Sequence, residues 1–183
     1  MAFDGVSSRS IVVIAAVCAL SCRARQETAT FQTPIGESDC KQPSSEIAAP
    51  YVARDLGVEE CRAPRDWRLL LVASDANSWI DITGPGVAWS GERPIVYESP
   101  IGNFPNVDSS PAIEWRLNGS GRPTAAIFRV TAQDPKNPEA QLSRFYAVRL
   151  AETAGCVVGR VATVEEARTL VESSPSCPDS RPR

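Results

Sequence analysis

Carboxylates are the side chains of this sequence best suited to do chemistry, because its 183 residues include no histidine. Histidine-based nucleophilic catalysis and imidazole-ligated metal sites are therefore excluded. A pair of carboxylates, one protonated and one ionised, can still cleave a glycosidic bond. Four acids lie in the central part of the chain, where such a pair could form: Asp75, Asp81, Glu98 and Glu114.

Each of these acids also has a structural explanation. Asp75 starts a turn and Glu98 begins a loop. Asp81 and Glu114 are expected on the solvent faces of alternating strands. No spacing singles out one pair, so the sequence favours a protein that is not an enzyme. A secreted hydrolase of carbohydrate or cell wall, using two carboxylates, is the alternative.

Patterns that bind cofactors or metals are weak. Gly84-Pro85-Gly86 has neither the spacing nor the following helix of a phosphate-binding loop. Residues 75–81 carry oxygen-bearing side chains at alternate positions but lack the glycine and the late glutamate of a calcium loop, which favours a turn. The cysteines lack the close spacing typical of zinc sites. We expect no cofactor and no metal.

The charge balance bears on possible partners. The chain has 19 Lys and Arg against 22 Asp and Glu, a formal net charge of -3 and a pI near 5.1. This balance supplies no cationic surface to neutralise a phosphate backbone, so we expect no nucleic-acid partner.

The beginning of the chain is typical of an export signal. Residues 1–21 combine a short head containing Arg9, an apolar run over 11–20 and small residues after it. Ten apolar residues span about 15 Å as a helix, which suits a signal peptide better than a membrane span. We expect a polar linker or tether over 22–37, a single domain over 38–178 and a loose tail over 179–183.

The residues Ala19-Leu20-Ser21-Cys22 add a second property to this signal. They resemble the lipobox of bacterial lipoproteins, in which cleavage occurs before a cysteine that is then acylated. The resemblance implies lipidation of Cys22, although Leu20 stands two positions before the cysteine where the motif usually has it three before. Ordinary cleavage after Ser21 or near Ala24 is the alternative.

Four cysteines remain in the expected domain: Cys40, Cys61, Cys156 and Cys177. In an exported protein they favour disulfides, and four cysteines allow three connectivities. The separations 40 to 61 and 156 to 177 are both 21 residues, so each neighbouring pair would close a moderate loop. We favour Cys40–Cys61 and Cys156–Cys177, each contributing about 3 kcal/mol.

Apolar patterns predict the elements of the domain. The run over 67–74 predicts a central strand that forms a hairpin with 79–82. Residues 87–89 and 94–97 predict a second hairpin, with Pro94 favouring an edge strand. Alternation over 112–117, followed by the turn residues 118–121, predicts a third hairpin with 124–130.

The last third of the chain completes the predicted fold. Strands are expected over 142–150 and 156–161, and the capping box Thr163–Glu166 begins a helix that ends near Ser173. The fold class is α+β, with a mostly antiparallel sheet of six to eight strands and one C-terminal helix. A small β-barrel or β-sandwich is the alternative.

Residues 98–111 form a 14-residue connection without a regular pattern. Loops of this length are usually functional or disordered. Ile101, Phe104 and Val107 stand three apart, so they either close one end of the core or, through Phe104 with Tyr97 or Trp89, present an apolar anchor to a partner. We predict partner-binding residues at Tyr97, Ile101 and Phe104.

These observations predict an exported envelope protein, periplasmic, anchored to the outer membrane or extracellular. We expect it to act by binding an unknown envelope protein or small ligand. Contact with the membrane is expected only through a lipid anchor. An inhibitor of an extracellular enzyme, using a rigid loop such as 98–111, is a further alternative.

Overall fold

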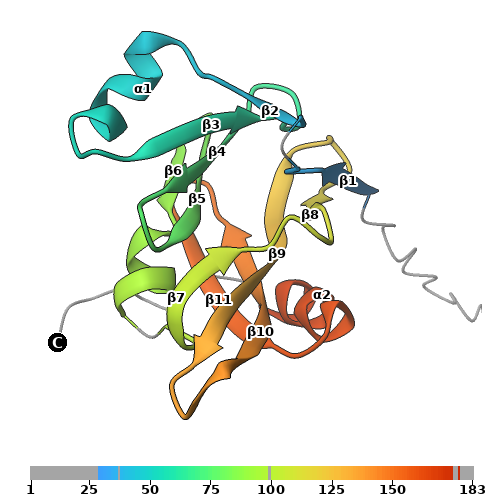
Figure 1. Cartoon of the computed structure of the whole chain (residues 1–183). Helices are drawn as coiled ribbons and strands as arrows, with labels where there is room; N and C mark the ends of the chain where they lie inside the picture. The colour runs from blue at the N-terminus through green and yellow to red at the C-terminus, as the bar shows by residue number, and fades with distance from the viewer. Residues whose placement is uncertain (1–28, 37, 99, 175–176, 178–183) are drawn as a thin grey trace, which may run out of the picture.

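The computed structural model describes residues 29–36, 38–98, 100–174 and 177 (Figure 1). Its strands form two separate antiparallel sheets accompanied by helices, so the predicted α+β class is confirmed. The alternative of a closed barrel is wrong. The eleven strands exceed the six to eight expected, because short strands with little apolar alternation, such as Cys40–Lys41, also pair.

The two sheets differ in size. The six-stranded sheet has the order β1 (Ala29–Thr33), β8 (Ile113–Leu117), β9 (Pro123–Asp134), β10 (Asn137–Leu150) and β11 (Gly155–Val161), and β7 (Asn103–Val107) also pairs with β9. The five-stranded sheet has the order β2 (Cys40–Lys41), β3 (Gly57–Cys61), β4 (Arg68–Ala73), β5 (Ser78–Gly84) and β6 (Val87–Ser90).

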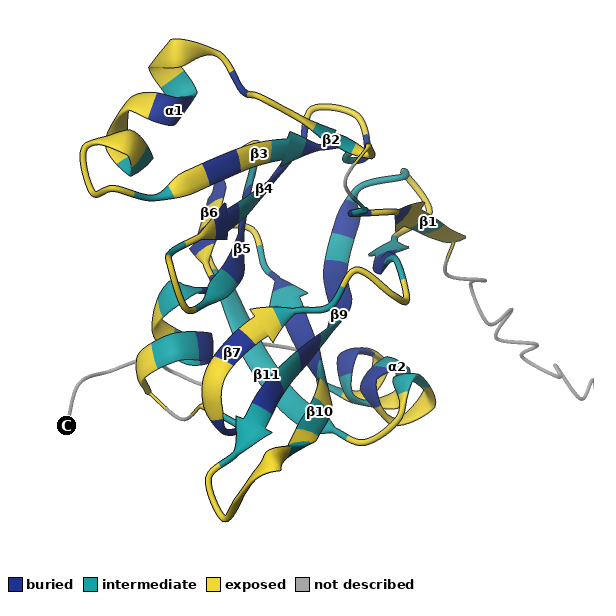
Figure 2. Ribbon diagram, viewed as in Figure 1, coloured by how far each residue is buried: buried dark blue, intermediate teal, exposed yellow. Residues whose placement is uncertain are grey.

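One core joins the two sheets. Trp67, which precedes β4, meets Trp115 of β8 edge-on with ring centroids 6.3 Å apart. The Trp115 Nε1–H donates to the buried Thr33 hydroxyl of β1 at 2.8 Å, and that hydroxyl donates to the carbonyl of Arg62 at 2.7 Å. In Figure 2, β9 is buried along most of its length, whereas the first helix is largely exposed.

Two of the predicted hairpins are confirmed. β4 and β5 pair across a turn closed by the Ser74 N–H and the Asn77 carbonyl at 2.8 Å. β8 and β9 pair across the predicted turn, where Gly121 has a φ of 78° that a side chain would disfavour. The Asn118 side chain accepts hydrogen bonds from the backbone N–H groups of Ser120 and Arg122 in the same turn.

The expected strand over 94–97 is wrong. The predicted strand over 87–89 forms as β6, but it pairs with β5 and not with 94–97, where the chain forms a single π-helical turn, η1 (Arg93–Tyr97). Pro94 lies in the first turn of η1, where its missing N–H is not needed. Ile95 is fully buried below η1, so its apolar character reflects a contact with the core rather than strand pairing.

The part of the chain before residue 60 contains the largest differences from expectation. Residues 29–33, expected within the tether, form β1 and pair with β8. The helix α1 (Ser45–Val52) was not predicted, because it contains Pro50 and has no side-chain cap to mark its start. Figure 1 places α1 over the five-stranded sheet, far from the C-terminal helix.

The C-terminal helix is confirmed as α2 (Val164–Ser173). Both halves of the predicted capping box form, with Thr163 accepting from the Glu166 N–H and Glu166 accepting from the Thr163 N–H. Ala167 and Val171 are buried where α2 packs on β9, β10 and β11. The helix therefore covers one face of the six-stranded sheet.

Both predicted disulfides are confirmed. Cys40–Cys61 joins directly opposed residues of β2 and β3, and Cys156–Cys177 ties β11 to the chain beyond α2. Two disulfides indicate an oxidising compartment. None of the helices in the described ranges is long and apolar enough to cross a membrane. The predicted signal, Cys22 and residues 179–183 lie outside the described residues.

Candidate functional site

Part of the connection over 98–111 is strand β7, not the irregular loop expected from its sequence. Ile101 and Val107 pack against the core, as one of the two interpretations required. Phe104 does not: its exposed fraction is 58%. The spacing of three apolar residues therefore combines two roles, with Ile101 and Val107 holding the segment and Phe104 presented to solvent.

Phe104 has a strained backbone. Its φ is 52°, in the left-handed region that a bulky residue rarely adopts, and it precedes Pro105, which further restricts it. The strain coincides with a β-bulge, because Asn103 opposes Gln133 and Asn106 opposes Thr131, leaving two residues of β7 against one of β9. Bulges redirect side chains and are frequent beside functional sites.

The bulge is held by contacts with the five-stranded sheet. The Asn106 Nδ2–H donates to the Phe104 carbonyl at 2.9 Å and lies 3.3 Å from the Ala76 carbonyl. The Val107 N–H donates to the Ser78 hydroxyl at 2.8 Å. Phe104 is thus an exposed aromatic side chain on a backbone fixed from both sheets.

Tyr97 lies on the neighbouring element. It ends η1, which is in contact with β7, and Figure 1 shows the two elements side by side. Its exposed fraction of 69% is the largest among the large hydrophobic residues described. We call Tyr97 and Phe104 the aromatic surface. Trp89, the other candidate anchor, is buried against Phe128 and belongs to the core.

Asp81 is buried, so the expected position on a solvent face is wrong. α1 contacts β3, and its Tyr51 hydroxyl donates to the Asp81 carboxylate of β5 at 2.8 Å. Burial raises the pKa of Asp81, and the hydroxyls of Ser90 and Tyr51 offset part of that rise. Burial and the Asp81 contact also raise the pKa of Tyr51.

Glu114 is also buried, with an exposed fraction of 3%, against expectation. Here the cover is α2, whose Arg168 binds both carboxylate oxygens with its Nη2 at 2.6 Å and its Nε at 3.0 Å. Arg116 adds a contact at 3.2 Å and also pairs with Glu172 of α2 at 2.7 Å. Burial alone would raise the pKa of Glu114, but the two arginines lower it below its ordinary value.

The four candidate acids do not form a catalytic pair in a cleft. Asp75 is exposed in the β4–β5 turn, and Glu98 is exposed after η1 in an ion pair with Arg93 at 2.7 Å. Asp81 and Glu114 each fasten a helix to a different sheet. A carboxylate held ionised by two arginines is unsuited to act as a general acid.

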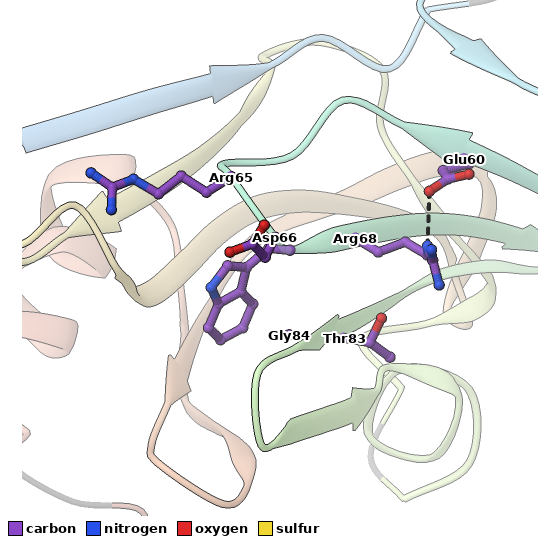
Figure 3. Close-up of a pocket in the computed structure, with 7 residues that line it drawn as sticks. Glu60, Arg65, Asp66, Arg68, Thr83 and Gly84 are labelled. Atoms are coloured by element: carbon purple, nitrogen blue, oxygen red, sulfur yellow. Dashed lines mark hydrogen bonds and ion pairs between the residues drawn. The ribbon is translucent and has the colours of Figure 1, made fainter.

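A polar pocket of about 420 Å³ lies at the ends of β3, β4 and β5 (Figure 3). None of the four candidate acids lines it. The lining residues are Glu60, Arg65, Asp66, Trp67, Arg68, Thr83 and Gly84. The sequence analysis did not identify this site, because its charges come from a loop and two strand ends with no recognisable spacing.

Comparisons with known proteins do not place the chain in a family. No family model matches it, and neither a curated protein nor a solved structure does. The function must therefore be argued from the geometry of the site.

Proposed function

We propose that the protein is an exported, non-enzymatic binding module of the bacterial envelope that recognises a protein partner through the aromatic surface. The strained and exposed Phe104 carries this proposal. Its side chain is more than half exposed and lies outside the core cluster, yet it occupies a backbone position where glycine would remove the strain. Backbone strain at a residue that lies outside the core is expected where the side chain serves recognition.

The chemistry of the aromatic surface fits a protein partner. Tyrosine and phenylalanine supply large contact areas with few rotatable bonds, and aromatic residues are enriched at interaction sites. Both side chains stand on elements anchored in the core, Tyr97 through the buried Ile95 and Phe104 through Val107. A fixed surface loses little conformational entropy on binding.

The proposed location rests on the predicted signal and the two disulfides. Intact-mass analysis of the protein from its native host tests it. We expect loss of residues 1–21, two disulfides and either an acylated Cys22 or a free new N-terminus. A retained signal together with four free thiols would overturn the export proposal.

Photo-crosslinking tests recognition at the aromatic surface. A photoreactive phenylalanine analogue replaces Tyr97 in the full chain, and the matched control carries it at Lys136, which is exposed in the β9–β10 turn. We expect position 97, but not position 136, to crosslink to one defined protein in an envelope extract. Equal crosslinking from both positions contradicts a specific surface.

The partner's identity distinguishes an adaptor from an inhibitor. An inhibitor would bind an extracellular enzyme at its active site and lower its activity, and the fixed β7 segment has the rigidity that this role needs. The crosslinked protein is therefore assayed for activity with and without the purified module.

A further inference from the structure

Three non-glycine residues among those described have left-handed backbones: Asp55, Arg65 and Phe104. Asp55 follows α1, where the Leu56 N–H bonds back to the Tyr51 carbonyl, and aspartate tolerates this conformation at a helix end. Phe104 belongs to the aromatic surface. Arg65 remains, and it lines the polar pocket.

Arg65 occupies a turn position that favours glycine. The Trp67 N–H bonds to the Pro64 carbonyl at 3.0 Å, which makes Arg65 the first central residue of a four-residue turn. A φ of 43° there, without a positive φ at Asp66, corresponds to a type II′ turn, in which glycine is preferred at this position. Arg65 thus carries backbone strain at a position that lines the pocket, and its side chain extends toward the β8–β9 turn (Figure 3).

The charges of the pocket divide into a satisfied pair and an unsatisfied pair. Arg68 Nε donates to Glu60 at 2.8 Å, so these two largely neutralise each other (Figure 3). Within the part of the chain that the structure describes, no hydrogen bond or ion pair involves the side chains of Arg65 and Asp66. Both residues are exposed, so the edge of the pocket offers one unpaired cation and one unpaired anion.

Two glycines allow neighbouring side chains of the pocket to pack closely. The Trp67 indole lies so close to Gly84 that a Cβ at position 84 would be 2.4 Å from the ring. The Arg65 guanidinium lies against the β8–β9 turn, where a Cβ on Gly121 would be 2.9 Å from its Nη2. Both glycines therefore allow close packing, of the Trp67 indole against β5 and of the Arg65 guanidinium against the β8–β9 turn.

We infer that this pocket binds a small zwitterion, an amino acid or short peptide, whose carboxylate pairs with Arg65 and whose ammonium pairs with Asp66. A guanidinium can bind a carboxylate through two parallel hydrogen bonds, and an aspartate is a suitable acceptor for an ammonium. Trp67 supplies the apolar contact. The volume lies within the range of small-ligand sites, about 300–1,000 Å³.

Titration with glycylglycine, followed by NMR of the Trp67 indole N–H, tests this inference on the full chain. We expect saturable binding with a dissociation constant on the order of 1 mM. N-acetyl-glycylglycine and glycylglycine amide each lack one charge, and we expect both to bind at least about tenfold more weakly. No saturable shift up to about 20 mM, or equal binding of either blocked peptide, would overturn the inference.

Two variants and one control connect the binding to the pocket. Arg65→Gly removes the guanidinium at a backbone position suited to glycine, so the variant is expected to fold with an unchanged or higher melting temperature while binding falls at least about tenfold. Asp66→Asn is expected to weaken binding similarly. Arg144→Gln, an exposed arginine of β10, serves as the control. Unchanged binding in a folded Arg65→Gly variant contradicts the assignment.

Discussion

The side-chain amide of Asn106 donates a 2.9 Å hydrogen bond to the carbonyl oxygen of Phe104, two residues earlier in the same strand. This contact closes the β7 bulge on itself and holds the strained peptide that directs the phenyl ring to solvent. The aromatic surface is thus built by local backbone geometry, and its exposure does not depend on a mobile loop.

Replacing Phe104 with glycine should separate stability from recognition. Relief of left-handed strain, about 1–3 kcal/mol, outweighs the roughly 0.5–1 kcal/mol that glycine costs through chain entropy. We therefore expect thermal unfolding to show an unchanged or higher melting temperature. Phe104→Ala keeps the strain and removes a side chain that is 58% exposed, so its stability should change by less than about 1 kcal/mol. A large loss of stability in both variants would assign Phe104 to the core.

The carboxylate of Glu114 should be one of the largest single contributors to stability. Glu114→Gln leaves the partly buried Arg116 and Arg168 without their shared anion, and we expect a loss of about 3 kcal/mol in urea unfolding. Glu165→Gln is the matched control, because Glu165 is exposed and only 3.6 Å from the same Arg168; it should cost less than about 0.5 kcal/mol. Similar losses of stability in both variants would contradict a specific role for Glu114 in binding the two arginines.

The pH dependence of that loss has a defined sign. Because the pKa of Glu114 is lower in the folded chain, the folded state binds its proton less tightly than the unfolded state. The stabilisation is complete above the ordinary glutamate pKa of about 4.3 and disappears as pH falls from there through the lowered pKa. The difference between wild type and Glu114→Gln should narrow below about pH 4.

Asp81 should behave in the opposite way. Its pKa is raised by burial, so the folded state binds the proton more tightly and wild-type stability falls as pH rises from the ordinary aspartate pKa through the raised value. Asp81→Asn removes this titration and keeps an acceptor for Tyr51, so its stability relative to wild type should increase over that interval. Unfolding measured from pH 4 to pH 7 checks the slope; a relative stability that decreases with pH contradicts the burial of an ionisable Asp81.

The two disulfides should stabilise different parts of the molecule. Removing either pair by double serine substitution should cost about 3 kcal/mol. In the variant with Cys156→Ser and Cys177→Ser, backbone hydrogen exchange should increase in α2. In the variant with Cys40→Ser and Cys61→Ser, it should increase in β2 and β3. Uniform exchange changes in both variants would contradict the separate roles.

The sequence predicted those parts of the fold that local chemistry determines. Strict alternation located β8, the turn residues after it located the hairpin with β9, and Thr163 with Glu166 located the start of α2. The equal spacing of 21 residues within each neighbouring pair of cysteines led to the correct disulfide pairs. The signals for β8, for the hairpin with β9 and for α2 lie within a few residues of the elements that they predict. The disulfide pairs were predicted from the spacing of the cysteines.

Tertiary contacts decided the rest. Asp81 and Glu114 alternate with apolar residues, as solvent-facing residues do, but Tyr51 of α1 binds the first carboxylate and Arg168 of α2 binds the second. β1 has a mixed sequence in which Phe31 is the one large apolar residue, and it pairs with β8, whose Trp115 indole donates to Thr33. Phe104 is exposed because β7 has a bulge at this residue, just before a proline. Arg65 and Asp66 line the pocket because they form a turn. Hydrophobic periodicity detects neither a bulge nor a turn.

Affinity capture by the wild-type chain and the Phe104→Gly variant, quantified by mass spectrometry, tests the central claim most directly. The bait is exposed to an envelope extract of the native host, with Val52→Ala as the control because Val52 is an exposed hydrophobic residue of α1. We predict that wild type and Val52→Ala retain the same protein and that Phe104→Gly retains at least roughly tenfold less of it. Identical capture by all three proteins would contradict recognition through the aromatic surface.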